Sequence, residues 1–186
     1  MTLGGGQIKA GRGPLIGNAG EYFVMGELLR RSATAGLTPR GATAWDILTR
    51  CGDRDVRIRV KTRTAAASEV ARDSGGWVWS ARESDGVVFK ELGGGDDWTI
   101  LVALDEPPAQ PRYWVLPTAK VLELITDRYA KWLAAPGKGG RKRNASTMRR
   151  LTEAEVTEYR EAWDRLWGPP ADSGKGEVEA ARPGMQ

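Results

Sequence analysis

The sequence predicts an α/β or α+β domain in which helices flank a mixed β-sheet. Three observations predict this fold class: an apolar helical repeat near the N-terminus, several β-patterned segments in the middle, and two later helical patterns. The chain has 186 residues, enough for one domain with a substantial core. We expect a flexible leader at 1–16, one domain at 17–167, and a disordered tail at 168–186, where proline, glycine and charge dominate.

The first elements are a helix and two strands. The helix begins near Asn18, a suitable N-cap, and runs to about Arg31. Residues 43–49 form the first strand, and residues 55–63 form the second, joined by a turn. In the second strand apolar and basic residues alternate strictly, so its basic side chains share one face. They are Arg57, Arg59, Lys61 and Arg63.

Further strand patterns complete the sheet. Residues 77–80 and 87–90 predict a hairpin across a polar segment. Residues 98–104 are continuously apolar, which is typical of a central strand buried on both faces. Residues 112–116 follow a proline-rich turn and are expected to pair with this central strand.

Two helical patterns and a basic loop follow the strands. Thr118 caps a helix whose apolar residues repeat to Trp132, and a glycine-rich basic loop occupies 137–150. Thr152 and Glu155 form a capping box that starts a last helix. The inner face of this last helix is predicted to hold Val156, Tyr159, Trp163 and Leu166.

The composition excludes several classes of chemistry. Histidine is absent and Cys51 is the only cysteine, which excludes histidine-based catalysis, histidine-ligated metals and a disulfide within the chain. Any metal would need oxygen ligands, as Mg²⁺, Mn²⁺ and Ca²⁺ do. No apolar run approaches the roughly 18 residues of a membrane span, and the N-terminus lacks the apolar core of a signal peptide. We therefore expect a cytoplasmic protein.

Three polar residues stand out against these patterns. Glu21 precedes apolar helix residues by three, four and seven positions, so it is predicted on the inner face, where a carboxylate needs a cation or donors. A plainer explanation is an acid that favours the helix dipole and stays at the rim. Asp46 lies within a predicted strand, where aspartate is disfavoured, and indicates a function, a bulge or a strand end. Lys61 closes the polar face of the next strand and by itself suits a solvated edge.

The order and spacing of three segments resemble the PD-(D/E)XK nuclease superfamily. They are residues 20–22 (GEY), 45–47 (WDI) and 58–63 (IRVKTR), and 15 residues separate Asp46 from Lys61. The last segment is similar to the I-Q-V-K-T strand of one prokaryotic branch. The resemblance spans roughly 17–167. It implies a restriction-endonuclease-like core and a prokaryotic endonuclease that hydrolyses DNA with Mg²⁺ (or Mn²⁺).

The resemblance also implies roles for particular residues. Glu21, Asp46 and the backbone carbonyl of Val60 would hold the metal, and Glu21, Asp46 and Lys61 would be catalytic. A hard cation binds the scissile phosphate and lowers the pKa of an attacking water, and Mg²⁺ takes one or two protein carboxylates. Lys61 would orient the water or stabilise the developing charge.

Arg59 departs from the family pattern, because it stands where the family has Glu, Asp or Gln. A guanidinium has no acceptor, cannot ligate a metal and repels a cation. Three outcomes follow. A carboxylate from elsewhere, such as Asp53, Asp55 or Glu69, replaces the missing ligand; Arg59 contacts phosphate while two acids hold the metal; or catalysis is lost and a basic cleft remains.

The basic residues predict a nucleic-acid partner, with DNA expected first. Arg57, Arg59 and Arg63 would contact phosphates from the strand, and the loop would contribute Lys138, Arg141, Lys142 and Arg143. A solvated surface loop explains the loop residues equally simply. We expect no membrane partner and leave a homodimer open. The alternatives to an enzyme are an impaired relative that binds nucleic acid or a protein without cleavage, and a structural protein whose polar strand face is surface.

The eight tryptophans offer stacking surfaces for bases, but most lie on apolar patterns. We therefore place five in the core: Trp98, Trp114, Trp132, Trp163 and Trp167. Trp77 and Trp79 share one face of a short strand, where packing, a stacking platform and a dimer surface are alternatives.

Overall fold

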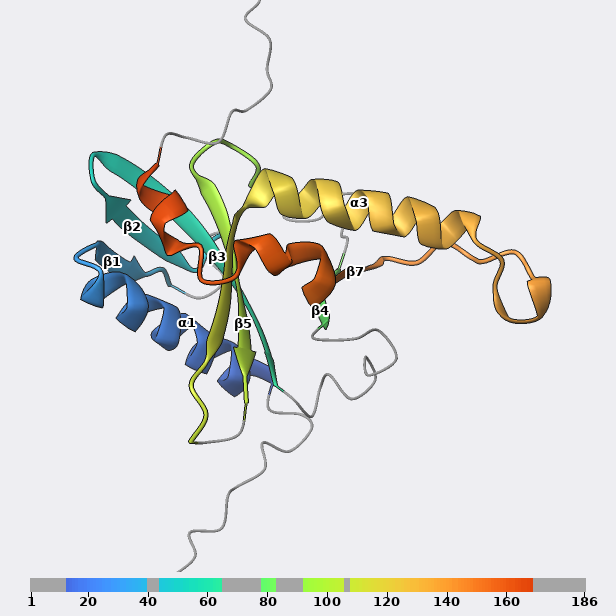
Figure 1. The fold of residues 1–186 in the computed structure, drawn as a ribbon, viewed down its shortest axis with the longest axis horizontal. Coiled ribbons are helices and arrows are strands. Elements are labelled where there is room, and N and C mark those ends of the chain that lie inside the picture. Colours follow the sequence, from blue (N-terminus) through green and yellow to red (C-terminus); the bar gives the residue numbers. More distant parts are fainter. Residues whose placement is uncertain (1–12, 40–43, 65–77, 83–91, 106–107, 169–186) are drawn as a thin grey trace, which may run out of the picture.

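The structure, a computed structural model, describes residues 13–39, 44–64, 78–82, 92–105 and 108–168. It is an α+β fold in which helices flank a mixed sheet, as predicted (Figure 1). The helices and strands are α1 (Gly13–Arg30), β1 (Thr34–Leu37), β2 (Ile47–Cys51), β3 (Arg54–Thr64), β4 (Val78–Arg82), β5 (Asp97–Leu104), β6 (Arg112–Pro117), α3 (Thr118–Ala134) and β7 (Met148–Thr152). Short 3₁₀ helices are η2 (Lys138–Gly140), η3 (Glu153–Tyr159) and η4 (Trp163–Trp167).

Within the described residues the main sheet has five strands, in the order β1-β2-β3-β5-β6. β3 and β5 run parallel, and the other neighbouring pairs run antiparallel. The predicted pairing of residues 112–116 with the central strand is confirmed. A smaller sheet in the described part of the chain pairs β4 with β7.

α1 covers one face of the main sheet because small and apolar residues recur along it every fourth position. Gly20, Val24 and Leu28 are its buried residues. A Cβ at Gly20 would lie 1.9 Å from Oγ1 of Thr62, so only glycine allows the helix backbone to approach β3 this closely. This close contact sets the level at which α1 crosses β3.

The two faces of β5 hold two cores, as expected of a central strand. Every residue of β5 is buried. Its Trp98, Ile100 and Val102 pack on the α1 side with Val24 and Leu28. On the other face, Leu101 and Ala103 pack with residues of α3, β4 and β7. α1 and α3 thus lie on opposite sides of the sheet (Figure 1).

The structure corrects several local predictions. α1 begins at Gly13, inside the segment expected to be a leader. β1 was not predicted. β4 pairs with β7, a pairing that was not predicted; the hairpin predicted with residues 87–90 lies outside the described residues. Arg149 and Arg150 therefore belong to a strand, not to a loop.

The C-terminal helix and the tryptophan placement also need correction. The capping box forms, but it begins η3 rather than a long α-helix, and positive φ at Glu161 separates η3 from η4. Trp98, Trp114 and Trp163 are buried as predicted, whereas Trp132 and Trp167 are 38% and 36% exposed. Trp79 is buried, and Trp77 lies outside the described residues. In the described ranges we find no helix with the length and apolar character needed to cross a membrane.

Candidate functional site

Asp46 lies immediately before β2, not within a strand as predicted. Its N–H donates to the carbonyl of Ile58 (2.8 Å), and its own carbonyl accepts the N–H of Thr38 (3.0 Å). Its side-chain Oδ2 accepts the N–H of Val60 at 2.7 Å. Two backbone hydrogen bonds fix Asp46 beside β3, and the third holds its carboxylate against the strand edge. Asp46 is thus a strand-end residue, and its functional role stays a prediction.

β3 extends beyond β2, which creates an open edge beside Asp46. β2 pairs with β3 only as far as Ile58, whereas β5 pairs with β3 as far as Thr64. The N–H of Val60 points to the side that β2 has left, where it meets Asp46. In an extended strand the N–H and C=O of one residue point to the same side. The Val60 carbonyl and the Asp46 carboxylate thus share this edge.

Lys61 projects from the face of β3 opposite α1. Residues alternate along a strand; Thr62 meets α1 at Gly20, and the cross-strand neighbour of Lys61 is Leu101 in the core on the far side. Burial lowers the pKa of Lys61 to about 8, with a further lowering by the charge of Arg59 and an opposing effect of Asp46. The charges of Asp46, Arg59 and Lys61 are therefore close enough to influence one another.

Arg59 ties β3 to the segment that leads into Asp46. Its Nη1 donates to the carbonyl of Ala44.

Among the residues that the structure describes, no group of three acids or cysteines could hold a metal. Asp55 pairs with Arg50 (3.1 Å) and lies six residues before Lys61, which is about 20 Å along an extended strand.

These distances exclude two of the three acids that could replace the metal ligand missing at the position of Arg59. Asp53 lies in the β2–β3 turn, even farther from Lys61 than Asp55 is, so neither acid can reach the site. Glu69, the third candidate, lies outside the described residues.

Glu21 lies on α1, next to Gly20, and is partly buried. Because Gly20 touches Thr62, the backbone at Glu21 lies at the level of Lys61 on β3. It comes to that level from the opposite face of the sheet. Leu29 is 51% exposed, so the inner stripe runs through Gly20, Val24 and Leu28, and Glu21 flanks it. Its role as a ligand stays a prediction.

The oxygen atoms at this edge fit a hard cation that takes few protein ligands. Asp46 and Val60 offer a carboxylate and a carbonyl on one side of β3. Mg²⁺ keeps several waters and uses one or two carboxylates, which matches this small donor set. Arg59 adds positive charge close to these oxygens and to Lys61, which opposes tight binding of a cation.

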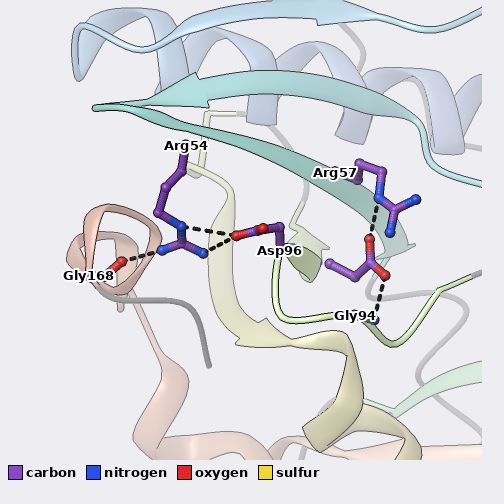
Figure 2. Close-up of polar contacts among 6 residues, drawn as sticks. Arg54, Arg57, Gly94, Asp96 and Gly168 are labelled. Atoms are coloured by element: carbon purple, nitrogen blue, oxygen red, sulfur yellow. Dashed lines mark hydrogen bonds and ion pairs between the residues drawn. The ribbon is translucent and has the colours of Figure 1, made fainter. Parts of the chain in front are cut away.

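Arg57, a predicted nucleic-acid contact, pairs with a buried acid that the sequence reading did not single out. Its Nε lies 2.6 Å from Oδ1 of Asp97, whose side chain is fully buried. Oδ2 of Asp97 accepts the N–H groups of Gly93 and Gly94, both at 2.7 Å. Figure 2 shows Arg57 and Gly94 on two sides of this carboxylate. A pair of aspartates after a glycine run, of which Asp97 is the second, was the available signal.

A second arginine ties this region to the C-terminal segment. Arg54 donates to Oδ1 of Asp96 through Nε (3.0 Å) and Nη2 (2.5 Å), and its Nη1 donates to the carbonyl of Gly168 (Figure 2). The start of β3, the turn before β5 and the end of η4 are thus joined. These contacts are structural, and they position β3, which carries Lys61 and whose Val60 N–H binds Asp46.

The other predicted nucleic-acid contacts lie farther along the same side. Arg63 donates to Oγ of Ser80 on β4, and burial followed by the charge of Arg150 lowers its pKa. Arg143 folds back onto the end of α3 through the carbonyls of Ala135 and Pro136 (3.1 and 3.2 Å). Arg141 and Lys142 are exposed, and the Lys138 side chain lies outside what the structure describes.

No protein-family model and no curated protein matches the chain. Among solved structures, the bacterial homing endonuclease I-Ssp6803I matches with a TM-score of 0.51 and 16% identity, over 84% of this chain and 94% of that one. The Holliday junction resolvase Hjc of the archaeal hyperthermophile Archaeoglobus fulgidus matches with a TM-score of 0.42 and 14% identity, over 76% and 88%. At such identities the comparison shows the fold: the chain has the restriction-endonuclease-like fold of the PD-(D/E)XK nucleases.

Proposed function

We propose that the chain is an endonuclease domain that hydrolyses DNA phosphodiester bonds with the help of Mg²⁺. One observation carries the proposal: the Asp46 carboxylate is bound to the Val60 amide beside Lys61 at an open strand edge. A nuclease-like fold around this edge supports it. The neighbouring homing endonuclease is by name a nuclease, and we carry that activity to this chain only as part of the proposal.

The proposal gives each residue of the edge a task. Asp46 and the Val60 carbonyl would hold the cation, with Glu21 as a further carboxylate. A bound cation supplies a Lewis acid for the phosphate and a more acidic water. Lys61 stabilises the charge that develops on the phosphate, and its pKa of about 8 lets it lose or gain a proton near neutral pH.

In this proposal Arg59 contacts phosphate while the acids hold the metal, which is the second of the three outcomes named in the sequence analysis. Its guanidinium suits bidentate contact with a phosphate, so Arg59 would bind the DNA strand while the acids hold the cation. The charge that weakens metal binding would thus strengthen substrate binding. Bound DNA, which is anionic, would then be needed for the cation to bind well.

Cleavage of a supercoiled plasmid in Mg²⁺, Mn²⁺ or EDTA tests the proposal. Asp46→Asn keeps an acceptor for the Val60 amide but removes the charge, and Lys61→Met removes the amine. Each should lower metal-dependent cleavage by at least about 100-fold. Asp55→Asn and Lys120→Met alter an acid and a lysine in surface ion pairs and should leave cleavage unchanged. Full cleavage by Asp46→Asn would refute the assignment of Asp46.

A second candidate function is binding of nucleic acid, or of a protein partner, without cleavage. Arg59 favours it, because its positive charge lies near the Lys61 amine and the Asp46 carboxylate. In this case the wild type would bind DNA in EDTA and show no cleavage with either metal. The cleavage assay separates the two candidates, and Arg59→Gln tests the repulsion that both assume: isothermal titration with Mn²⁺ should show tighter binding than to the wild type. An unchanged affinity would argue against repulsion by Arg59.

A further inference from the structure

A cavity lies against the second half of α3, away from the candidate site. The buried residues of α3 are Thr118, Val121 and Ile125, all in its first half, and the second half projects past the sheet (Figure 1). The following loop folds back along this projecting half. The N–H of Ser146 donates to the Tyr129 hydroxyl at 2.9 Å. Between α3, this loop and β7 lies a cavity of about 630 Å³, a volume suited to a ligand of nucleotide size.

The lining of the cavity combines aromatic rings with cations. Tyr129 and Trp132 stack with ring centroids 5.7 Å apart. The guanidinium of Arg143 lies 4.9 Å from the Trp132 ring centroid. Trp132 and Met148 remain 38% and 36% exposed, so apolar surface is open to a ligand beside positive charge. An anion that also carries an aromatic group matches this combination.

The charge of the cavity is positive. The described lining contains two acids, Asp127 and Glu155, against four cations, which are Arg128, Lys131, Arg143 and Arg150. Glu155 is engaged within the fold: it pairs with Arg128 (3.0 Å) and accepts both the N–H and the hydroxyl of Thr152 (2.8 and 2.6 Å). Arg128 and Glu155 thus compensate each other, and the remaining described lining has three cations against Asp127, so the cavity attracts phosphate.

The cavity connects to the candidate site through β3, β4 and β7. Arg63 lies two residues after Lys61 on the same face of β3 and donates to Ser80. Ser80 pairs directly across the small sheet with Arg150, which lines the cavity. A line of cations therefore runs from Lys61 through Arg63 to Arg150. A phosphate chain follows such a line well, because each cation meets one backbone charge.

We propose that this cavity binds a nucleoside phosphate, presented as an unpaired nucleotide of a nucleic-acid strand that continues to Asp46 and Lys61. The proposal rests on the proposed function, because the line of cations joins the two places. Trp132 would contact the base, and Arg143 and Arg150 would contact phosphate. Paired bases are stacked within a duplex and would not enter, so the cavity would favour single-stranded over duplex DNA.

Fluorescence anisotropy in EDTA, with a labelled single-stranded oligonucleotide and its duplex, tests the proposal without cleavage. Trp132→Ala should weaken single-strand binding roughly tenfold and duplex binding by less than about threefold. Trp132→Phe, which keeps a ring, should restore most of the affinity. Leu133→Ala changes an equally exposed neighbour on α3 and should have no effect. Equal losses for both DNA forms, or none, would overturn the proposal, provided that thermal melting shows folded variants.

Competition identifies the source of the nucleoside phosphate. The unlabelled oligonucleotide should displace the probe at far lower concentration than deoxyadenosine monophosphate does. Equal potency of the free nucleotide would overturn the strand as the ligand. Displacement by a glutamate-tyrosine copolymer at the potency of the oligonucleotide would overturn it in favour of a protein partner.

The same variants separate this proposal from the proposed function. Asp46→Asn should bind the single strand as the wild type does. If neither the wild type nor any variant cleaves DNA but Trp132→Ala still loses single-strand affinity, the cavity proposal is supported and the proposed nuclease activity is refuted. If cleavage depends on Asp46 but Trp132→Ala binds normally, only the cavity proposal fails.

Discussion

Arg57 and Asp97 form an ion pair whose two halves differ in exposure, and this difference predicts unequal mutant effects. The Asp97 side chain is fully buried, whereas the Arg57 side chain is 36% exposed. Arg57→Met leaves a carboxylate in the interior with the N–H donors of Gly93 and Gly94 but without its cation. Asp97→Asn leaves a guanidinium that water reaches, and the amide oxygen can still accept from Gly93 and Gly94. We therefore expect Arg57→Met to be the more destabilising change.

The magnitudes follow from the contacts. Removing one partner of a buried ion pair costs about 3–5 kcal/mol, and the two 2.7 Å bonds to Oδ2 offset part of this. The pair is also imperfect, because Oδ1 of Asp97 has no aligned hydrogen bond among the described residues. We expect about 2–4 kcal/mol for Arg57→Met. For Asp97→Asn we expect about 1–2 kcal/mol, the charge-assisted part of its bonds.

Urea unfolding of the single and double variants measures these free energies. For a chain of this size, 3 kcal/mol corresponds to roughly 6–12 °C in Tm. The double variant should lose less than the sum of the single losses. Arg50→Met breaks the exposed pair with Asp55 and should cost less than about 1 kcal/mol. A larger loss in Asp97→Asn than in Arg57→Met would refute the reasoning from burial.

Two further predictions concern the same region. Gly20→Ala should destabilise the fold by roughly 1–3 kcal/mol, because its Cβ would lie 1.9 Å from a β3 side chain. The control Gly26→Ala places a Cβ with no atom within 4 Å and should stabilise α1 by about 0.5–1 kcal/mol. Equal effects of the two substitutions on Tm would contradict the close contact at Gly20. Burial lowers the Lys61 pKa from 10.5 to about 8, so in EDTA the unfolded state holds more protons between these values and stability rises with pH across them. Lys61→Met does not titrate, so its free energy of unfolding in urea, relative to that of the wild type, should fall by on the order of 2 kcal/mol from pH 8 to pH 10.5. A difference in unfolding free energy that does not change with pH would contradict the lowered pKa.

Local patterns in the sequence predicted the elements that rest on local physics. The strict alternation of residues 55–63 and the apolar run of residues 98–104 correspond to β3 and β5. The capping box of Thr152 and Glu155 forms as predicted. Each pattern reports which faces of a segment are buried, and neighbouring residues alone determine it. The shared face of Arg59 and Lys61 follows from the same alternation.

Distant partners decided the rest, because pairing between segments depends on burial and hydrogen bonds that no local window contains. β4 pairs with β7, which follows it by more than sixty residues in the chain. Asp46 lies at a strand end because β3 extends beyond the last residue paired with β2. The Val60 N–H that this leaves unpaired donates to the Asp46 carboxylate instead. Arg57 met Asp97 across the parallel pair of β3 and β5. The sequence thus determined which side chains share a strand face, and the tertiary structure decided which of their charges are already neutralised inside the fold and which still face an open edge or cavity.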